Sequence, residues 1–235
     1  MIKLNSKQKI NAIFVFCVLL LTFFSKVECA VNVSEAEEEF KRAWNNPSYT
    51  QIRQDDVDIN KTLAKYYKTP YPVNFTRQML WDMETKKAWD PKTYLEYVVR
   101  DGKSWGKKFL ENGNEMFVRS SQQKQWLNGE VYEEVFEKVY LNHKAQKATF
   151  LGTQYLTGSA GEKLQLNNKQ PLFHVQHSVE GEENNPINVW RIVHLTDKKD
   201  QNLIDHFNKL NNPTVVPGFI EIYIKKDLQT PISHK

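Results

Sequence analysis

The sequence MLWDMETKKAWDP, residues 79–91, marks the point at which the hydrophobic pattern of this chain changes. Up to this point apolar residues recur at spacings of three and four, which predicts a helix from residue 74 or 75 to 88. Lys87 falls on the same helical face as Met83. Pro91 forbids continuation of the helix, and beyond it the period changes to two, which is typical of strands.

Outward from this helix, the chain divides into helices before it and strands after it. Before it, 34–45 and 57–68 are expected to be helical, the first because Ser34 and Glu37 form a capping box. After it, runs rich in Val, Tyr, Phe and Thr predict strands. These strands are Tyr94–Arg100, Glu115–Ser120, Val131–Leu141, Thr149–Thr157, Leu172–Val179 and Ile187–Leu195. A late helix is expected over 198–210, followed by a last strand, Phe219–Ile224.

This order predicts an α+β fold, in which N-terminal helices precede a curved antiparallel sheet of about six or seven strands with a late helix. We expect one domain over residues 30–235, with a helical N-terminal segment at 30–73 and the long helix plus the sheet at 74–235. The composition, 40% hydrophobic and 26% charged with nine Gly and nine Pro, is ordinary for a globular protein and excludes a collagen, a coiled coil and a multi-pass membrane protein.

The first 29 residues have the pattern of a secretory signal peptide. Three lysines precede an apolar run from Ile10 to Phe24, and small residues stand near a plausible cut after Cys29. The apolar run is shorter than the ~20 residues that span a bilayer. We therefore expect a secreted or periplasmic protein with no stable membrane span once the signal is removed; a retained N-terminal anchor is the alternative.

Removal of the signal changes the chemistry available to the chain. Both cysteines, Cys17 and Cys29, leave with it, so no disulfide or cysteine ligand is expected. Four of 32 basic and one of 28 acidic residues leave as well, and the net charge falls to about +1. Because lysine and glutamate alternate along the chain, no basic face for a nucleic acid is expected. Sequons at Asn32, Asn60 and Asn74 make it a possible glycoprotein in a eukaryotic host.

Residues 79–91 resemble the early helical segment of START and polyketide-cyclase-like proteins, the helix-grip superfamily. In that superfamily an acidic residue in the helix is followed seven residues later by a Trp-Asp pair, which here is Asp82 followed by Trp89-Asp90. The resemblance covers about residues 50–196 and implies an apolar pocket for a lipid, sterol or polyketide, in some members an enzyme. The chain departs from it at the end, where a long closing helix is expected and a strand is predicted after 198–210.

That tail is similar instead to the strand–helix–strand opening of ferredoxin-like dimeric monooxygenases. In those proteins Pro-Gly-Phe often precedes the second strand, and Pro217-Gly218-Phe219 stands at the equivalent place here. This second resemblance covers about 40 residues and implies a homodimer as a possibility.

Three polar residues stand among apolar neighbours on the predicted strands and are the candidate catalytic residues. Alternation places His177 with Val175 and Val179, and it places Arg191 with Val189 and Val193. Glu137 stands in the same way between Val135 and Val139. We expect Arg191 to hold a carboxylate or enolate and His177 to act as acid or base. Alternatively, Arg191 and Glu137 form a structural pair and His177 is a core residue.

Further residues are candidates for binding a ligand. They are His174, His194, Trp190, Tyr155, Phe136 and Trp89. A metal site is not expected, since a spacing of three on a strand sends His174 and His177 to opposite faces. Phosphate loops and hydrolase or metalloprotease motifs are absent from the sequence, and no cofactor is expected.

Three functions remain open from the sequence. The first is the binding of a small hydrophobic or amphipathic ligand, such as a lipid, polyketide or aromatic compound. The second is a cofactor-independent enzyme, of cyclase, isomerase or monooxygenase type, acting on such a molecule. The third is a domain with a filled core that works through its surface. A cavity with converging polar groups favours the first two.

Overall fold

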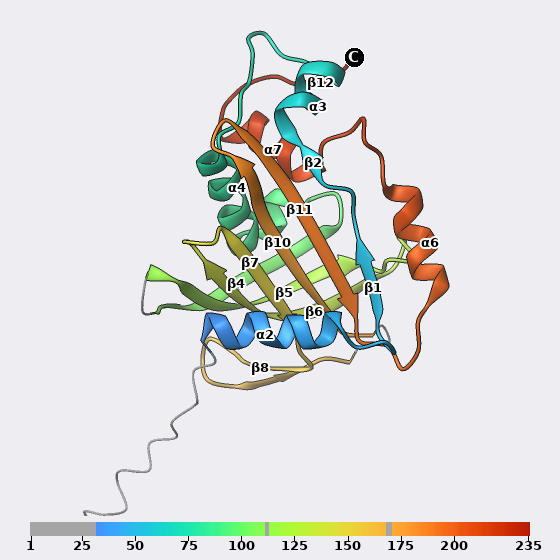
Figure 1. The fold of residues 1–235 in the computed structure, drawn as a ribbon. Coiled ribbons are helices and arrows are strands. Elements are labelled where there is room, and N and C mark those ends of the chain that lie inside the picture. The colour runs from blue at the N-terminus through green and yellow to red at the C-terminus, as the bar shows by residue number, and fades with distance from the viewer. Residues whose placement is uncertain (1–31, 111–112, 168–170) are drawn as a thin grey trace, which may run out of the picture. The chain divides into compact units, whose positions relative to one another are not determined.

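A computed structural model gives the fold of residues 32–110, 113–167 and 171–235 (Figure 1). The predicted signal peptide lies outside the described residues. In the described part, eight strands form one antiparallel sheet in the order β1-β11-β10-β7-β6-β5-β4, with β2 also pairing with β11. The strands are β1 (Thr50–Arg53), β2 (Val57–Asp58), β4 (Val99–Phe109), β5 (Glu115–Lys124), β6 (Tyr132–Asn142), β7 (Lys147–Gly152), β10 (Phe173–Glu182) and β11 (Asn185–His194).

The helices lie on both faces of this sheet. They are α2 (Val33–Trp44), α3 (Ile59–Tyr66), α4 (Arg77–Trp89), α5 (Pro91–Tyr94), α6 (Gln201–Leu210) and α7 (Gly218–Lys226). Helix α4 packs on the concave face, here called the inner face, against β10 and β11. Helix α2 crosses the opposite, outer face, where the Asn142 amide donates to Glu37 at 2.9 Å. The α+β class expected from the sequence is confirmed.

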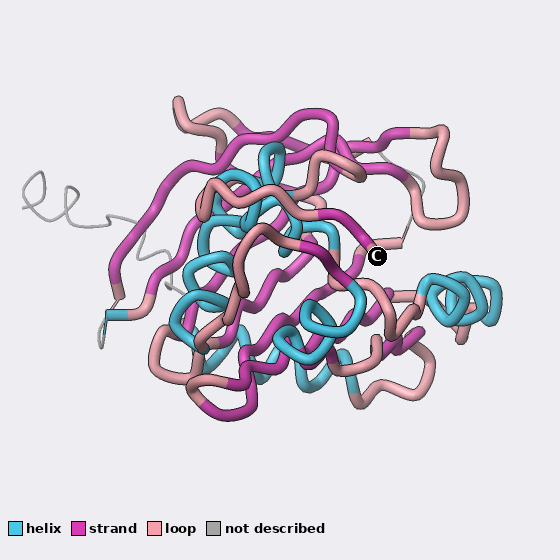
Figure 2. Tube along the Cα trace, turned by 90° about the horizontal axis from the view of Figure 1, so that it is seen from above, coloured by secondary structure: helices cyan, strands magenta, loops and turns pink. Residues whose placement is uncertain are grey.

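The sheet is strongly bent, because β4 and β5 cross the direction of β10 and β11 (Figure 1). The pairing of β4 with β5 shifts register twice, between Val99 and Asp101 and between Trp105 and Lys108. Such irregularities increase local twist and bend a strand. Seen from above, strands therefore stand on two sides of the central helices, while α6 lies beside the sheet, against β1 (Figure 2).

Helix α4 begins and ends where its sequence dictates. The Thr76 hydroxyl accepts the Met79 N–H as an N-cap, and Pro91 stops the helix after Trp89. Asp90 then caps the short helix α5 by accepting the Thr93 N–H at 3.1 Å. The expected helix over 74 or 75 to 88 is thus confirmed, within two or three residues at its start and one residue at its end.

Two predicted strands are wrong. The first expected strand, Tyr94–Arg100, begins too early. Tyr94 is the last residue of helix α5, and strand β4 begins only at Val99. Phe219–Ile224 lies within helix α7. Short apolar runs fit either period, and here Phe219 and Tyr223 are buried at helical spacing. The tail therefore lacks the strand–helix–strand order of the ferredoxin-like monooxygenases. Two short helices, α6 and α7, follow the last long strand, where the START resemblance implies one long helix.

Smaller differences concern the boundaries. The expected strand Thr149–Thr157 is divided into β7 and β8 (Tyr155–Thr157), which pairs with β9 (Lys163–Gln165). The expected helix 57–68 contains β2, α3 and β3 (Tyr67–Lys68), which pairs with β12 (Ser233–His234). Strand β1 lies in a segment expected to be helical. No helix in the described part of the chain is long and apolar enough to cross a membrane.

The sequon residue Asn60 has a structural use. Its side-chain oxygen accepts the Phe75 N–H at 2.7 Å, and its amide donates to the carbonyls of Phe75 and Asn184 at 2.9 and 3.0 Å. This clasp ties α3 to the segment before α4 and to the β10–β11 turn. A glycan on Asn60 would break it, whereas Asn74 is exposed.

Candidate functional site

A cavity of about 400 Å³ lies between the inner face of the sheet, helices α4, α6 and α7, and the α6–α7 linker. Aromatic and aliphatic side chains form most of its wall. They include Trp126, Phe150, Phe173, Val175, Trp190 and Phe219. Phe173 and Val175 point inward because they alternate along β10 with residues of the outer face. Ligand sites are commonly concave and apolar in this way.

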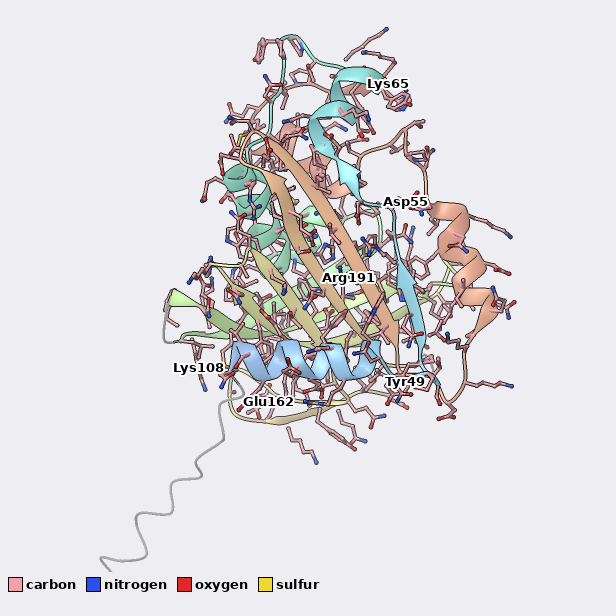
Figure 3. The ribbon with its side chains drawn as sticks, viewed as in Figure 1. Tyr49, Asp55, Lys65, Lys108, Glu162 and Arg191 are labelled. Atoms are coloured by element: carbon pink, nitrogen blue, oxygen red, sulfur yellow. The ribbon has the colours of Figure 1, made fainter. Side chains whose placement is uncertain are left out.

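The cavity opens where its lining reaches solvent. Asp55, Leu210 and Asn212 line it and are exposed, and they come from the β1–β2 connection and the C-terminal end of α6. The Asp55 N–H donates to the side-chain oxygen of Asn211 at 3.1 Å, which joins the two sides of this opening. Figure 3 labels Asp55 beside α6. The opening is thus built from loop and helix-end residues, whereas the floor is built from α4 and the sheet.

A buried charged cluster forms part of the floor. Lys87 Nζ lies 2.5 Å from Glu84 Oε2, one turn earlier on α4, and 3.0 Å from His177 Nδ1 on β10. Asn188 on β11 donates to Glu84 Oε1 at 2.8 Å. Both charged side chains are almost completely enclosed, with 2% of Lys87 and none of Glu84 exposed. We call Glu84, Lys87, His177 and Asn188 the floor cluster.

The protonation of the floor cluster follows from burial and proximity. Burial alone would raise the pKa of Glu84, but Lys87 and His177 outweigh it and lower the pKa to about 2. Burial lowers the pKa of Lys87 to about 8 against the opposing effect of Glu84, and Arg119 adds to the lowering. Burial, together with Lys87, lowers the pKa of His177 to about 4. Near neutral pH Glu84 is therefore a carboxylate, Lys87 is an ammonium group with a lowered pKa, and His177 is a neutral imidazole.

The imidazole tautomer is fixed by its neighbour. The ammonium of Lys87 can only donate, so Nδ1 of His177 accepts and Nε2 carries the proton. The ring also stacks on Trp190, with centroids 5.3 Å apart. His177 is therefore held in one orientation at the boundary between the floor cluster and the apolar wall.

A second buried ion pair lies beside the floor cluster. Arg119 on β5 donates to Glu137 on β6 at 2.6 Å, and its guanidinium also donates to the Ala88 carbonyl at 3.2 Å. A cation at the C-terminal end of α4 interacts favourably with the unpaired carbonyls and the dipole of that helix. Both residues line the cavity. The pair anchors the end of α4 to the bent part of the sheet.

Of the three candidate catalytic residues, the structure brings two to the cavity. His177 and Glu137 line it, but Arg191 does not. The register of β10 and β11 places His177 opposite Trp190, and Gln176 opposite Arg191. Opposed residues share a face, so Arg191 lies on the outer face with Gln176 (Figure 3). The expected convergence of Arg191 with His177 and Glu137 is wrong, because alternation within a strand does not fix the register between strands.

The candidate ligand-binding residues are similarly divided. Trp190 lines the cavity, and His194 lies behind its wall against the rings of Trp126, Phe173 and Phe207. The other four do not line the cavity. His174 and Phe136 are buried toward the outer face, Tyr155 is exposed on β8, and Trp89 packs edge-on against Phe117 at the surface.

The sequence reasoning missed Glu84, Lys87 and Arg119 as site residues. One signal was available, since Lys87 falls on the apolar face of the expected helix, where a lysine is costly unless paired. Glu84, three residues earlier, was its obvious partner. Arg119 lies on the same face of β5 as the buried residues Phe117 and Ser121. The strand expected from the sequence ended at Ser120, so this alternation was not followed through Arg119 to Ser121. Among the described residues, no group of three or more histidine, cysteine or acidic side chains could hold a metal ion.

Comparison with known proteins gives only distant likenesses. No family model matches the chain, and no curated protein matches it. Among solved structures, it is similar to the protein TTHA0849 from Thermus thermophilus, with a TM-score of 0.46 and 8% identity over 74% of this chain and 97% of that one. It is also similar to truncated norcoclaurine synthase from Thalictrum flavum, with a TM-score of 0.39 and 11% identity over 79% and 98%.

A third similar structure is the di-domain ARO/CYC StfQ from the steffimycin biosynthetic pathway. The TM-score is 0.37, with 7% identity over 83% of this chain and 49% of that chain. Similarities this low identify neither a family nor a function.

Substitution of His194 by leucine should flatten the pH dependence of stability. Burial lowers the pKa of His194 to about 4, and neither ring nitrogen has a hydrogen-bond partner in the described residues. Between pH 6.5 and 4 the unfolded chain binds a proton that the native chain does not, so native stability falls as the pH falls. For wild type this contributes a loss of about 2–3 kcal/mol by pH 4.5.

Urea unfolding at pH 7 and at pH 4.5 measures the effect. We expect the His194→Leu variant to be as stable as wild type at pH 7, because an apolar side chain replaces a buried unpaired polar group. At pH 4.5 it should be the more stable of the two. An equal loss of stability in both proteins would contradict the assignment of His194 as a neutral buried group.

Proposed function

We propose that this protein is exported and binds a small, largely apolar molecule in the cavity between its sheet and helices. The observation that carries the proposal is the cavity itself, which combines an apolar aromatic wall with a polar floor. Protein interiors are close-packed and leave few voids larger than a water molecule. An open space of about 400 Å³ lies within the range of small-molecule sites. It argues against the hypothesis of a filled core that works through its surface.

The chemistry of the lining restricts the ligand. An apolar or aromatic body fits against Trp126, Phe173 and Val175, because these side chains offer no hydrogen bonds apart from one indole N–H. A polar end group of the ligand would meet Lys87 and His177 at the floor. An amphipathic molecule with one hydrogen-bonding end satisfies both parts.

An enzyme acting on such a molecule is the second candidate. It is favoured by the contact between Lys87 and His177, whose pKa values are lowered to about 8 and about 4 in the floor cluster. Groups with displaced pKa values that line a cavity are typical of catalytic sites. In such an enzyme Lys87 and His177 would transfer protons to or from the bound molecule. Glu84 would stabilise the protonated form of Lys87 as its ion-pair partner.

Filling the cavity should abolish binding without unfolding the protein. Val175 lines the cavity from β10, and a phenylalanine in its place occupies space that a ligand would use. We expect the Val175→Phe variant to bind anilinonaphthalene sulfonate about tenfold more weakly than wild type, or not at all. Energy transfer from tryptophan to the probe reports binding at the cavity, since Trp126 and Trp190 line it.

The matched control is Ser178→Ala, on the same strand but on the outer face. It should bind the probe as wild type does. Circular dichroism shows whether both variants fold. Equal affinity in the folded Val175→Phe variant and in wild type would overturn the assignment of the cavity as the binding site.

Export predicts a defined mature N-terminus. If the signal peptide is cut after Cys29, the exported protein begins at Ala30 and contains no cysteine. Intact mass and N-terminal sequencing of protein recovered from the medium or periplasm of the producing cell measure this directly. Recovery only of cell-associated chains that begin at Met1 would contradict export.

A further inference from the structure

We propose that Lys87 forms a covalent imine with the carbonyl carbon of an aldehyde or ketone ligand bound in the cavity. This inference rests on the proposed function, because it needs a ligand in that space. It adds the chemical class of the ligand and a reaction at one named atom, Nζ of Lys87.

The position of Lys87 gives it access to a ligand in the cavity while little of its side chain is exposed at the protein surface. It lies in the last turns of α4, is almost completely enclosed, and lines the cavity. Its Nζ is 3.8 Å from the centroid of the Phe219 ring, which lines the same cavity. A molecule in the cavity therefore meets this amine within the protein interior.

The neighbours of Lys87 orient the amine for attack. In the neutral form its two N–H groups can donate to Glu84 Oε2 and to His177 Nδ1, which stay within 2.5 and 3.0 Å. The lone pair then takes the remaining direction. Lys87 lines the cavity, so a ligand there can reach Nζ, and the Phe219 ring, whose centroid is 3.8 Å away, packs beside the amine.

The surroundings also increase the fraction of neutral amine. Desolvated lysines, and lysines beside another cation, are the ones that act as nucleophiles. Lys87 has both features, since it is buried and Arg119 lies near it, and its pKa is lowered to about 8. The adjacent Lys86 is the opposite case. It is partly exposed between Asp82 and Asp227, each at 2.7 Å, and these carboxylates raise its pKa.

The reaction is balanced without an oxidant or reductant. The Nζ lone pair forms a bond to the carbonyl carbon, and a proton passes from nitrogen to the carbonyl oxygen to give a carbinolamine. The carbon–oxygen bond then breaks, the oxygen leaves as one molecule of water with the second amine proton, and a carbon–nitrogen double bond remains. If the imine nitrogen is protonated, Glu84 is already in place as its counter-ion.

Reductive trapping tests the proposal. The mature protein, residues 30–235, is incubated at pH 8 with 3-phenylpropanal and sodium cyanoborohydride. The modified lysines are then mapped by peptide mass spectrometry. We expect one adduct at Lys87, formed about tenfold faster than at any other lysine, with a rate that rises through pH 8. Lys86→Arg should react as wild type does, whereas Lys87→Arg should lose the fast adduct.

Two results would overturn the proposal. One is labelling spread over surface lysines with no preference for Lys87, which the wild-type map shows without any variant. The other is an unchanged fast adduct in a folded Lys87→Arg protein.

Displacement of anilinonaphthalene sulfonate separates this failure from failure of the proposed function. If 3-phenylpropanol and 3-phenylpropanal both displace the probe but the aldehyde leaves Lys87 unmodified, the imine is excluded and binding stands. If neither displaces the probe and Lys87 stays unmodified, both proposals fail.

Discussion

The buried ion pair of Glu84 and Lys87 lies at the centre of the contact between helix α4 and the sheet. It places opposite, buried charges where α4 meets β10 and β11. Removing one partner of such a pair leaves an uncompensated charge, at a cost of about 3–5 kcal/mol. Both partners belong to α4, so the helix is tied to the sheet by the contacts that complete the pair, from Lys87 to His177 on β10 and from Asn188 on β11 to Glu84.

The cavity follows from this constraint together with the bend of the sheet. The floor is polar, and its charged groups are paired with one another, so the apolar wall can stand beside it. The bent β4–β5 end is held to α4 by Arg119 and Glu137, and α7 is held to α4 by Tyr223, which donates to Asp82 at 2.9 Å. These attachments keep a space open between the sheet and the helices, and the linker after α6 borders it.

Sequence reasoning reached the fold more securely than the site. Long periodic segments such as α4, β6 and β10 could be predicted because their burial repeats along the chain. Phe219–Ile224 could not, since a short run of apolar residues fits a helix and a strand equally well. Within the site, alternation correctly grouped His177 with Val175, but only the pairing of His177 with Trp190 shows that Arg191 lies on the other face. Lys87 was visible as a lysine on an apolar face, yet its role depends on β10, which is 90 residues away.

The most direct test of the account is a crystal structure of the mature protein under xenon pressure. Xenon enters apolar cavities that are large enough to hold it. We expect xenon density against Trp126, Val175 and Phe219, with Lys87 still paired to Glu84 beneath it. An interior filled by the protein's own side chains, with no xenon bound on the inner face of the sheet, would contradict it.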